Sequence, residues 1–250
     1  MRYPLLDTLR GFSLVSMVLY HYSWDLVFLS HKRIAWFSGT PGYLWQQSIC
    51  WAFILISGFS LALALHGKKR TAALKKSGLL LLLGSLITAV TDAFLPQGRI
   101  LFGILFFLGA ATLLMPLGGN RTPLSPEAAA VLSCLLFLAT RNVPFGCLGF
   151  EGLTGPVLPA SLYTHGLWGT FWGFPGKDFR SADYFPLLPW FFLFATGYFS
   201  GRALLQKEKL PPVFRVSVPP LSALGRHSLI LYLLHQPLLL LFVPGVSLFS

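Results

Sequence analysis

Residues 44–65 read LWQQSICWAFILISGFSLALAL, a stretch without a single charged side chain. An α-helix needs about 20 residues to cross the ~30 Å hydrocarbon layer of a bilayer, so this stretch predicts a transmembrane helix. Of the 250 residues, 54% are hydrophobic and 11% are charged, whereas a soluble domain carries roughly a quarter charged residues. The charges needed to cover a water-facing surface are missing. The composition therefore predicts an integral membrane protein and excludes a soluble fold.

Long apolar runs recur along the chain and are separated by short polar segments; the fifth run is short. They predict an all-α, polytopic transmembrane helix bundle of about seven spans, at 11–29, 44–65, 77–94, 100–117, 126–140, 184–205 and 221–243. The stretch 143–180 is rich in Gly, Pro and aromatic residues. It fits a long external loop, a re-entrant segment or a broken eighth helix, because irregular backbone at depth must line a cavity or pack on protein. We expect residues 1–250 to form one membrane-embedded domain.

The lysines and arginines predict the orientation of the spans. If the N-terminus is cytoplasmic, thirteen of the 19 Lys and Arg residues fall on the inner side, and segment 66–76 alone carries five. Cytoplasmic loops of membrane proteins are enriched in these residues, so we expect the N-terminus inside and the C-terminus outside. The net charge of +11 is assigned to topology and to anionic lipid head groups. Without a basic patch interleaved with base-stacking residues, no nucleic-acid partner is expected.

Two ionisable residues stand inside the first span, where each charged group costs at least ~2.5–3.5 kcal/mol on insertion scales. His21 lies about 15 Å beyond Gly11 along a helix, near the bilayer midplane. Asp25 follows four residues later on the same helix face. A carboxylate beside an imidazole can fix its tautomer and stabilise its protonated form. The sequence leaves two interpretations open, a catalytic base and a helix-packing pair.

The last span carries a second histidine at a matching depth. His235 lies nine residues after Arg226, or about 13–14 Å along a helix, and Gln236 and Pro237 follow it. A proline inside a helix frees a backbone carbonyl one turn earlier and kinks the helix. A kink beside a His-Gln pair indicates a cavity wall, although a kinked packing helix with an interhelical hydrogen bond explains it equally well.

The remaining polar and aromatic residues cluster near the membrane ends. Asp7, Arg10 and Arg226 are expected at the inner mouth, and Asp92 with Arg99 at the outer side as a structural ion pair. Five tryptophans are interpreted as interfacial belt residues: Trp45, Trp51, Trp168, Trp172 and Trp190. The three cysteines have no metal-ligand spacing, and the chain has no Walker loop, GxSxG or HExxH motif. No metal is expected.

Several short motifs together resemble the bacterial branch of the heparan-α-glucosaminide N-acetyltransferase catalytic-domain family. They span nearly the whole chain in the right order: LDTLRG (6–11), MVLYHYSWDL (17–26), ISGFSL (56–61), FGIL (102–105), DYFPLLPW (183–190) and LGRHSL (224–229), followed by Tyr232 and the HQP of 235–237. The first and last are also similar to broader membrane acyltransferases that modify sugars and envelope polymers.

The resemblance implies a multi-pass enzyme of the bacterial inner membrane that carries an acyl group from cytoplasmic acetyl-CoA, or another acyl-CoA, to a sugar or glycan acceptor. It also implies a central histidine. In the animal relatives that histidine lies shortly before the second span, ahead of a tryptophan, whereas Trp45 here follows Thr40-Pro41-Gly42-Tyr43-Leu44. The role therefore cannot be carried over by position. His21 is chosen on depth and pairing, and His31 is a second candidate.

The resulting hypothesis is acyl transfer inside the bundle. His21, steadied by Asp25, deprotonates the acceptor or carries the acyl group, and His235 with Gln236 holds the thioester oxygen or the acceptor. Arg10 and Arg226 contact the CoA phosphates. A transporter or channel using the same midplane residues is the main alternative, and a structural membrane subunit is a third. The acceptor, N- or O-acylation, a covalent acyl-enzyme or direct transfer, and the oligomeric state, for example a homo-oligomer, stay open.

Overall fold

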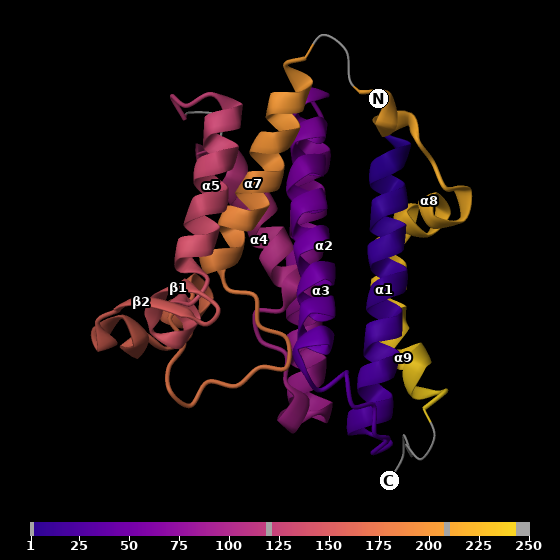
Figure 1. Ribbon diagram of the computed structural model, residues 1–250, viewed down its shortest axis with the longest axis vertical. Coiled ribbons are helices and arrows are strands. Elements are labelled where there is room, and N and C mark those ends of the chain that lie inside the picture. The colour runs from indigo at the N-terminus through magenta and orange to yellow at the C-terminus, as the bar shows by residue number, and fades with distance from the viewer. Residues whose placement is uncertain (1–2, 119–121, 208–210, 244–250) are drawn as a thin grey trace. The chain divides into compact units, whose positions relative to one another are not determined.

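A computed structural model describes residues 3–118, 122–207 and 211–243 and is mostly helical (Figure 1). The chain divides into two compact units, Met1–Ile56 with Lys209–Ser250, and Ser57–Glu208. The single membrane-embedded domain stays a prediction. Arg2, Arg121 and Lys209, which contribute to the predicted charge asymmetry, lie outside the described residues.

The first unit joins the two ends of the chain. It contains α1 (Pro4–Phe28), the start of α2 (Thr40–His66), the 3-10 turn η4 (Pro212–Arg215), α8 (Pro219–Arg226) and α9 (Ser228–Leu240). Its core consists of Leu14, Met17 and Ile49, against which side chains of α8 and α9 also pack. The N- and C-terminal helices are therefore held together by apolar packing around α1.

Two glycines allow α1 and α8 to cross with their backbones in contact. A Cβ at Gly11 would meet the backbone of Leu221, and a Cβ at Gly225 would meet the carbonyl oxygen of Asp7. Close approach of this kind is what small residues permit in membrane helix pairs. Beside the crossing, the hydroxyls of Thr8 and Ser222 lie 2.6 Å apart.

The predicted span 221–243 is not one continuous helix. α8 ends at Arg226, His227 has φ −105° and ψ 18°, and α9 begins at Ser228. The polar stretch Gly225-Arg226-His227-Ser228 interrupts the apolar run at this point, but a few polar residues do not by themselves show whether a helix continues or breaks. This break matters for the site, because His235 lies on α9, a helix separate from α8.

The second unit contains the end of α2 together with α3 (Arg70–Phe94), η1 (Pro96–Gly98), α4 (Ile104–Gly118), α5 (Pro126–Thr140) and α7 (Leu187–Leu205). Glycines again mark close contacts: a Cβ at Gly58 would meet the Phe194 backbone, and one at Gly84 would meet Phe106. Helix α3 begins about two turns before the predicted residue 77. Lys75 and Lys76 are therefore helical rather than part of a loop.

The expectation of an all-α chain is wrong between residues 143 and 180. This segment forms η2 (Val143–Phe145), an antiparallel hairpin of β1 (Cys147–Phe150) and β2 (Leu153–Val157), η3 (Ala160–Thr164) and the short helix α6 (Gly166–Trp172). Gly149 pairs with Thr154 and has φ +125°, a conformation that favours glycine. The Gly and Pro residues that interrupt a helix here instead permit a hairpin.

Three helices of the described chain are long and apolar enough to cross a membrane: Thr40–His66, Arg70–Phe94 and the α5 stretch Pro126–Phe145. Two shorter apolar helices are Ile104–Gly118 and Ser228–Leu240. Helices thus occupy every predicted span, with the last one broken. Seven membrane crossings and the orientation of the N-terminus stay predictions.

Candidate functional site

The two predicted midplane histidines lie against each other in the first unit. The ring centroids of His21, on α1, and His235, on α9, are 4.8 Å apart with the planes tilted by 59°. Each ring also contacts a tyrosine: Tyr20 meets His21 edge-on at 5.9 Å, and Tyr232 lies 5.4 Å from His235. The matched depths derived from sequence therefore correspond to a real pair of imidazoles, 214 positions apart in the chain.

The hydrogen bonding of His235 defines which of its nitrogens is basic. Nδ1 is hydrogen-bonded to the carbonyl oxygen of Tyr232, one turn earlier on α9. A carbonyl only accepts, so Nδ1 must carry the proton, and in the neutral ring Nε2 then carries the lone pair. Nε2 is buried and has no hydrogen-bond partner among the described residues. Nε2 is thus a buried hydrogen-bond acceptor to which none of the described residues donates.

Asp25 lies where the sequence predicts it, but its partner is different. Its carboxylate is fully buried and accepts from the side-chain amide of Gln236, with Nε2 3.0 Å from Oδ1 and 3.2 Å from Oδ2. The expected His21–Asp25 pair does not form, because α9 brings a better donor to the carboxylate than the neighbouring turn of α1 does. The other amide atom, Gln236 Oε1, is buried without a partner in the part of the chain that the structure describes.

An aromatic wall flanks the histidine pair. The Trp45 indole donates from Nε1 to Ser16 Oγ at 2.7 Å, and the Tyr20 ring lies 5.4 Å from Trp45 and 5.0 Å from Phe37. Trp45 is thus committed to a contact with α1 in addition to any interfacial position. No role for Ser16 or Phe37 is predicted from sequence. The only available signal is that Ser16 lies four and five residues before Tyr20 and His21.

The two arginines proposed for phosphate contact differ in their availability. Arg10 donates from Nη1 to the Asp7 carboxylate at 2.9 Å, so its guanidinium is already engaged by an acid on the same helix. Arg226 is exposed at the end of α8, and its neighbour Gly225 packs on the Asp7 backbone. The two arginines therefore lie near the same crossing. His31 is exposed in the link between α1 and α2 and has φ +52°.

Asp183, in the second unit, fastens two distant segments together. Its Oδ2 accepts from the backbone N–H of Ile104 at 3.0 Å, at the start of α4. Ser181 supports the same contact by accepting from the N–H of Leu101 at 2.9 Å. Burial raises the pKa of Asp183 to about 6, although the hydrogen bond from Ile104 opposes the shift. This carboxylate caps a helix.

Of the other predictions, the Asp92–Arg99 ion pair is confirmed and the position of Trp190 is corrected. The Asp92–Arg99 ion pair is present at 3.4 Å. Trp190 is buried rather than interfacial, and the Arg141 guanidinium lies 4.8 Å above its ring. Among the described residues, no group of three or more His, Cys, Asp or Glu side chains could hold a metal ion.

Comparison with known proteins identifies one family. The model described as "Heparan-alpha-glucosaminide N-acetyltransferase, catalytic" matches residues 2–237. Neither a curated protein nor a solved structure matches the chain. The match includes α1, α8 and the part of α9 that carries His235 and Gln236.

Proposed function

Because the chain belongs to the heparan-alpha-glucosaminide N-acetyltransferase catalytic family, we propose that it is a membrane acetyltransferase that moves an acetyl group from cytoplasmic acetyl-CoA to a sugar or glycan acceptor. The observation that supports this most directly is the contact between the half-buried imidazoles of His21 and His235. We place the protein in the bacterial inner membrane as a multi-pass protein with its N-terminus in the cytoplasm.

The chemistry requires a base beside the reacting thioester. The imidazole lone pair takes a proton from the hydroxyl or amine of the sugar or glycan acceptor. The oxygen or nitrogen of that group attacks the thioester carbonyl at the same time. The C–S bond then breaks, and the imidazolium returns the proton to the departing CoA thiolate. His235 Nε2 suits this task because the Tyr232 carbonyl holds the proton on Nδ1. His21, in ring contact with it, is the second imidazole that can take or relay the proton.

The other proposed residues bind and orient. Asp25, one turn beyond His21, and Gln236, next to His235, fasten α1 to α9, which fixes the angle between the two rings. Arg226 is the better candidate for a CoA phosphate, because Arg10 is engaged by Asp7. A guanidinium suits this role because it donates to phosphate oxygens in a planar fork.

Acetyl transfer by the purified protein in liposomes tests the proposal. Radiolabelled acetyl-CoA is supplied with a panel of amino sugars and envelope glycans, and binding of acetyl-CoA is measured separately. We expect His21→Ala and His235→Ala to lower the transfer rate by about 10²–10⁴-fold, the usual contribution of a general base, with acetyl-CoA binding retained.

Two further variants make the result specific. His165→Ala removes an exposed histidine of the other unit and should leave transfer unchanged. His31→Ala tests the second candidate and should also be active. Full activity of both His21→Ala and His235→Ala would remove the pair from the mechanism. Solute flux without an acyl donor, together with an absence of acetyl-CoA binding, would instead identify a transporter.

A further inference from the structure

The segment after α5 forms a small lobe at one end of the second unit. We call residues 143–173, which comprise η2, the β1–β2 hairpin, η3 and α6, the hairpin lobe (Figure 1). The candidate membrane span that contains α5 runs to Phe145, and β1 begins two residues later at Cys147. Val157 pairs with Cys147 across the hairpin. The start of β1 and the end of β2 therefore both lie next to the end of the apolar span that contains α5.

The turn of the hairpin is fastened back onto the end of that helix. Asn142 Nδ2 donates to the carbonyl oxygens of Glu151 at 2.9 Å and Leu153 at 3.3 Å. The Glu151 carboxylate lies 3.1 Å from Nε of Arg141, a buried residue whose guanidinium stacks on Trp190 of α7. Both ends of the hairpin are thus held at the level of the helix terminus, so the hairpin cannot extend away into water.

The surface of the lobe is apolar where a soluble hairpin would be polar. Leu153 is 77% exposed, Val157 is 84% exposed, and Phe145 is 76% exposed. On α6, Phe171 packs against Phe102 and Phe106, which leaves Trp168 67% exposed. Isolated exposed apolar residues are normal on proteins, but a bare strand with large apolar side chains is an association hazard in water.

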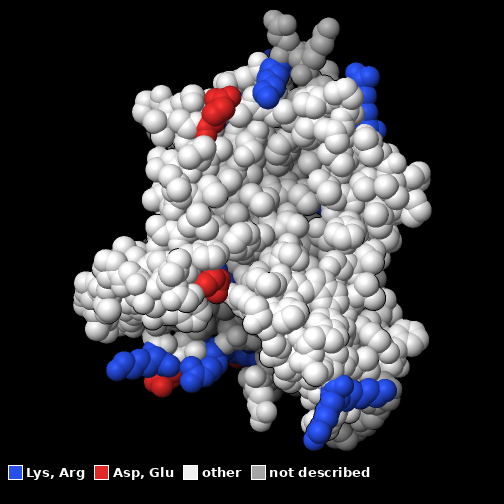
Figure 2. Space-filling view, viewed as in Figure 1, with Lys and Arg blue, Asp and Glu red and all other residues white. Residues whose placement is uncertain are grey.

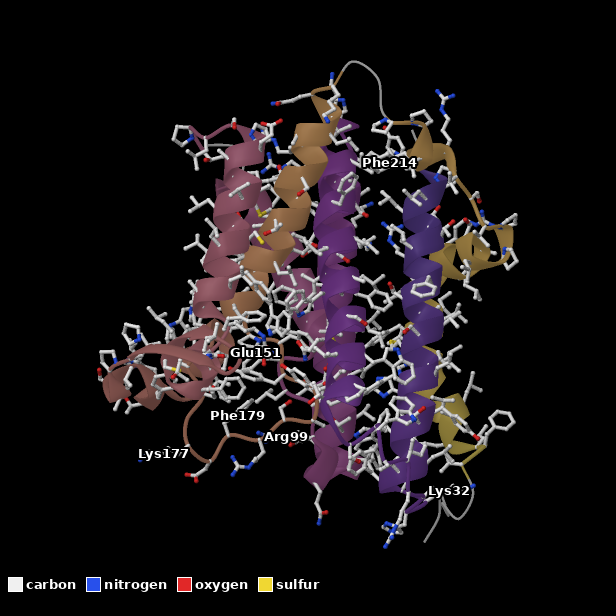
Figure 3. All side chains as sticks on the ribbon, viewed as in Figure 1. Lys32, Arg99, Glu151, Lys177, Phe179 and Phe214 are labelled. Atoms are coloured by element: carbon white, nitrogen blue, oxygen red, sulfur yellow. The ribbon has the colours of Figure 1, made fainter. Side chains whose placement is uncertain are left out.

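Charged residues lie at one edge of the lobe. Lys177 and Arg180 are exposed just after α6, and Figure 3 places Lys177 on the side of the lobe away from α5. In Figure 2 most of the lobe is uncharged: an acidic group shows at its inner edge, and basic and acidic colours lie together along its lower edge. Apolar and aromatic side chains next to a membrane span, followed by the charged Lys177, Asp178 and Arg180, match the order in which a bilayer offers acyl chains and polar head groups.

We propose that the hairpin lobe is an interfacial anchor that inserts Phe145, Leu153, Val157 and Trp168 into the lipid head-group region at the Thr140 end of α5. Helix α5 also has an exposed apolar face, which includes Val131 and Leu135. Burial of these side chains in the interface removes apolar area from water, and the hydrogen bonds of Asn142 hold the lobe at the depth where this occurs. The anchor restricts how the loop after α5 can move at the membrane surface.

Site-directed spin labelling of the full-length protein in vesicles tests this proposal. The background replaces Cys50, Cys134 and Cys147 by alanine, and one nitroxide is attached at Leu153→Cys or Val157→Cys. Asp178→Cys, at an exposed residue next to Lys177, is the matched control. The readouts are collision rates with oxygen, which concentrates in lipid, and with a water-soluble nickel chelate.

We expect a several-fold higher oxygen-to-nickel collision ratio at positions 153 and 157 than at 178. High nickel accessibility at all three positions would overturn the proposal by placing the lobe in water. Low accessibility to both reagents at 153 and 157, with an immobilised spectrum, would overturn it by showing that a protein surface covers the lobe. The three labelled positions are exposed, and a melting temperature equal to that of the unlabelled cysteine-free protein would show that each labelled protein is folded.

Discussion

The carboxylates of Asp25 and Asp183 are each held by a donor from a distant part of the chain. Gln236 reaches Asp25 across 211 positions, and the N–H of Ile104 reaches Asp183 across 79. Buried polar groups cost free energy unless they are paired. At the scale of single residues, these two contacts are therefore where substitutions should have the largest and most specific effects.

We expect Asp25→Ala to destabilise the protein by about 1–3 kcal/mol, because it leaves the Gln236 amide buried without its acceptor. Asp25→Asn keeps a side-chain oxygen in place and should cost less. Thermal unfolding in detergent, followed by intrinsic fluorescence, measures both. Equal stability of Asp25→Ala and the unaltered protein would show that the α1–α9 fastening contributes nothing.

Asp183 predicts a pH dependence of stability. Its pKa is about 6 in the folded chain, against about 3.9 in an unfolded one, so the folded state binds the extra proton between these values. The free energy of unfolding should therefore fall as the pH rises from about 4 to 6. Asp183→Asn retains an oxygen to accept from Ile104 and should remove this part of the pH dependence.

The comparison requires melting temperatures of both proteins from pH 4.5 to 7. The difference between them isolates Asp183 from other titrating groups. A constant difference across this range would contradict the prediction. Asp183→Ala, which also loses the cap on α4, should be less stable than Asp183→Asn by about 1 kcal/mol.

At the scale of helices, the crossing of α1 and α8 depends on two glycines. A methyl group at Gly11 would overlap the Leu221 backbone, and one at Gly225 would overlap the carbonyl of Asp7. Backbone atoms cannot move aside as a flexible side chain can, so the helices themselves would have to separate. We expect Gly11→Ala and Gly225→Ala each to destabilise the protein by about 1–3 kcal/mol, as overpacking does.

Gly78 provides the control for this prediction. It lies inside α3, and a Cβ there would meet no atom within 4 Å. Gly78→Ala should be neutral or stabilise by up to ~1 kcal/mol, because alanine favours the helix. If all three variants unfold at the same temperature, the crossing does not require glycine.

At the scale of the molecule, the helices of the second unit contact one another at both of their ends. A pocket of about 320 Å³ is lined by His66, at the end of α2, and by Arg202 and Gln206, at the end of α7. At the other end, Asp183 joins the start of α7 to the start of α4. The positive-inside rule assigns the link near His66, with Lys68 and Lys69, to the cytoplasm.

Labelling of intact cells tests this orientation. In the cysteine-free background, a membrane-impermeant maleimide should react with Lys177→Cys directly and with Lys68→Cys only after permeabilisation. Both positions are exposed, so each is open to the reagent. Labelling of both from the same side would refute the predicted alternation, and labelling of Lys68→Cys alone would reverse the orientation.

Sequence alone determined the membrane character, the positions of the long helices, the family, and the two histidines that meet. These properties follow from the length of apolar runs, from short motifs and from the fixed rise of a helix. The sequence could not give the Asp25–Gln236 pair, the break at His227 or the fold of residues 143–180. Partners 211 positions apart are chosen by packing. The polar stretch at 225–228 is compatible with a continuous helix as well as with a break, and Gly-rich and Pro-rich segments have no periodicity. Only tertiary structure decides such features, because each depends on which donor, backbone or surface another element brings within reach.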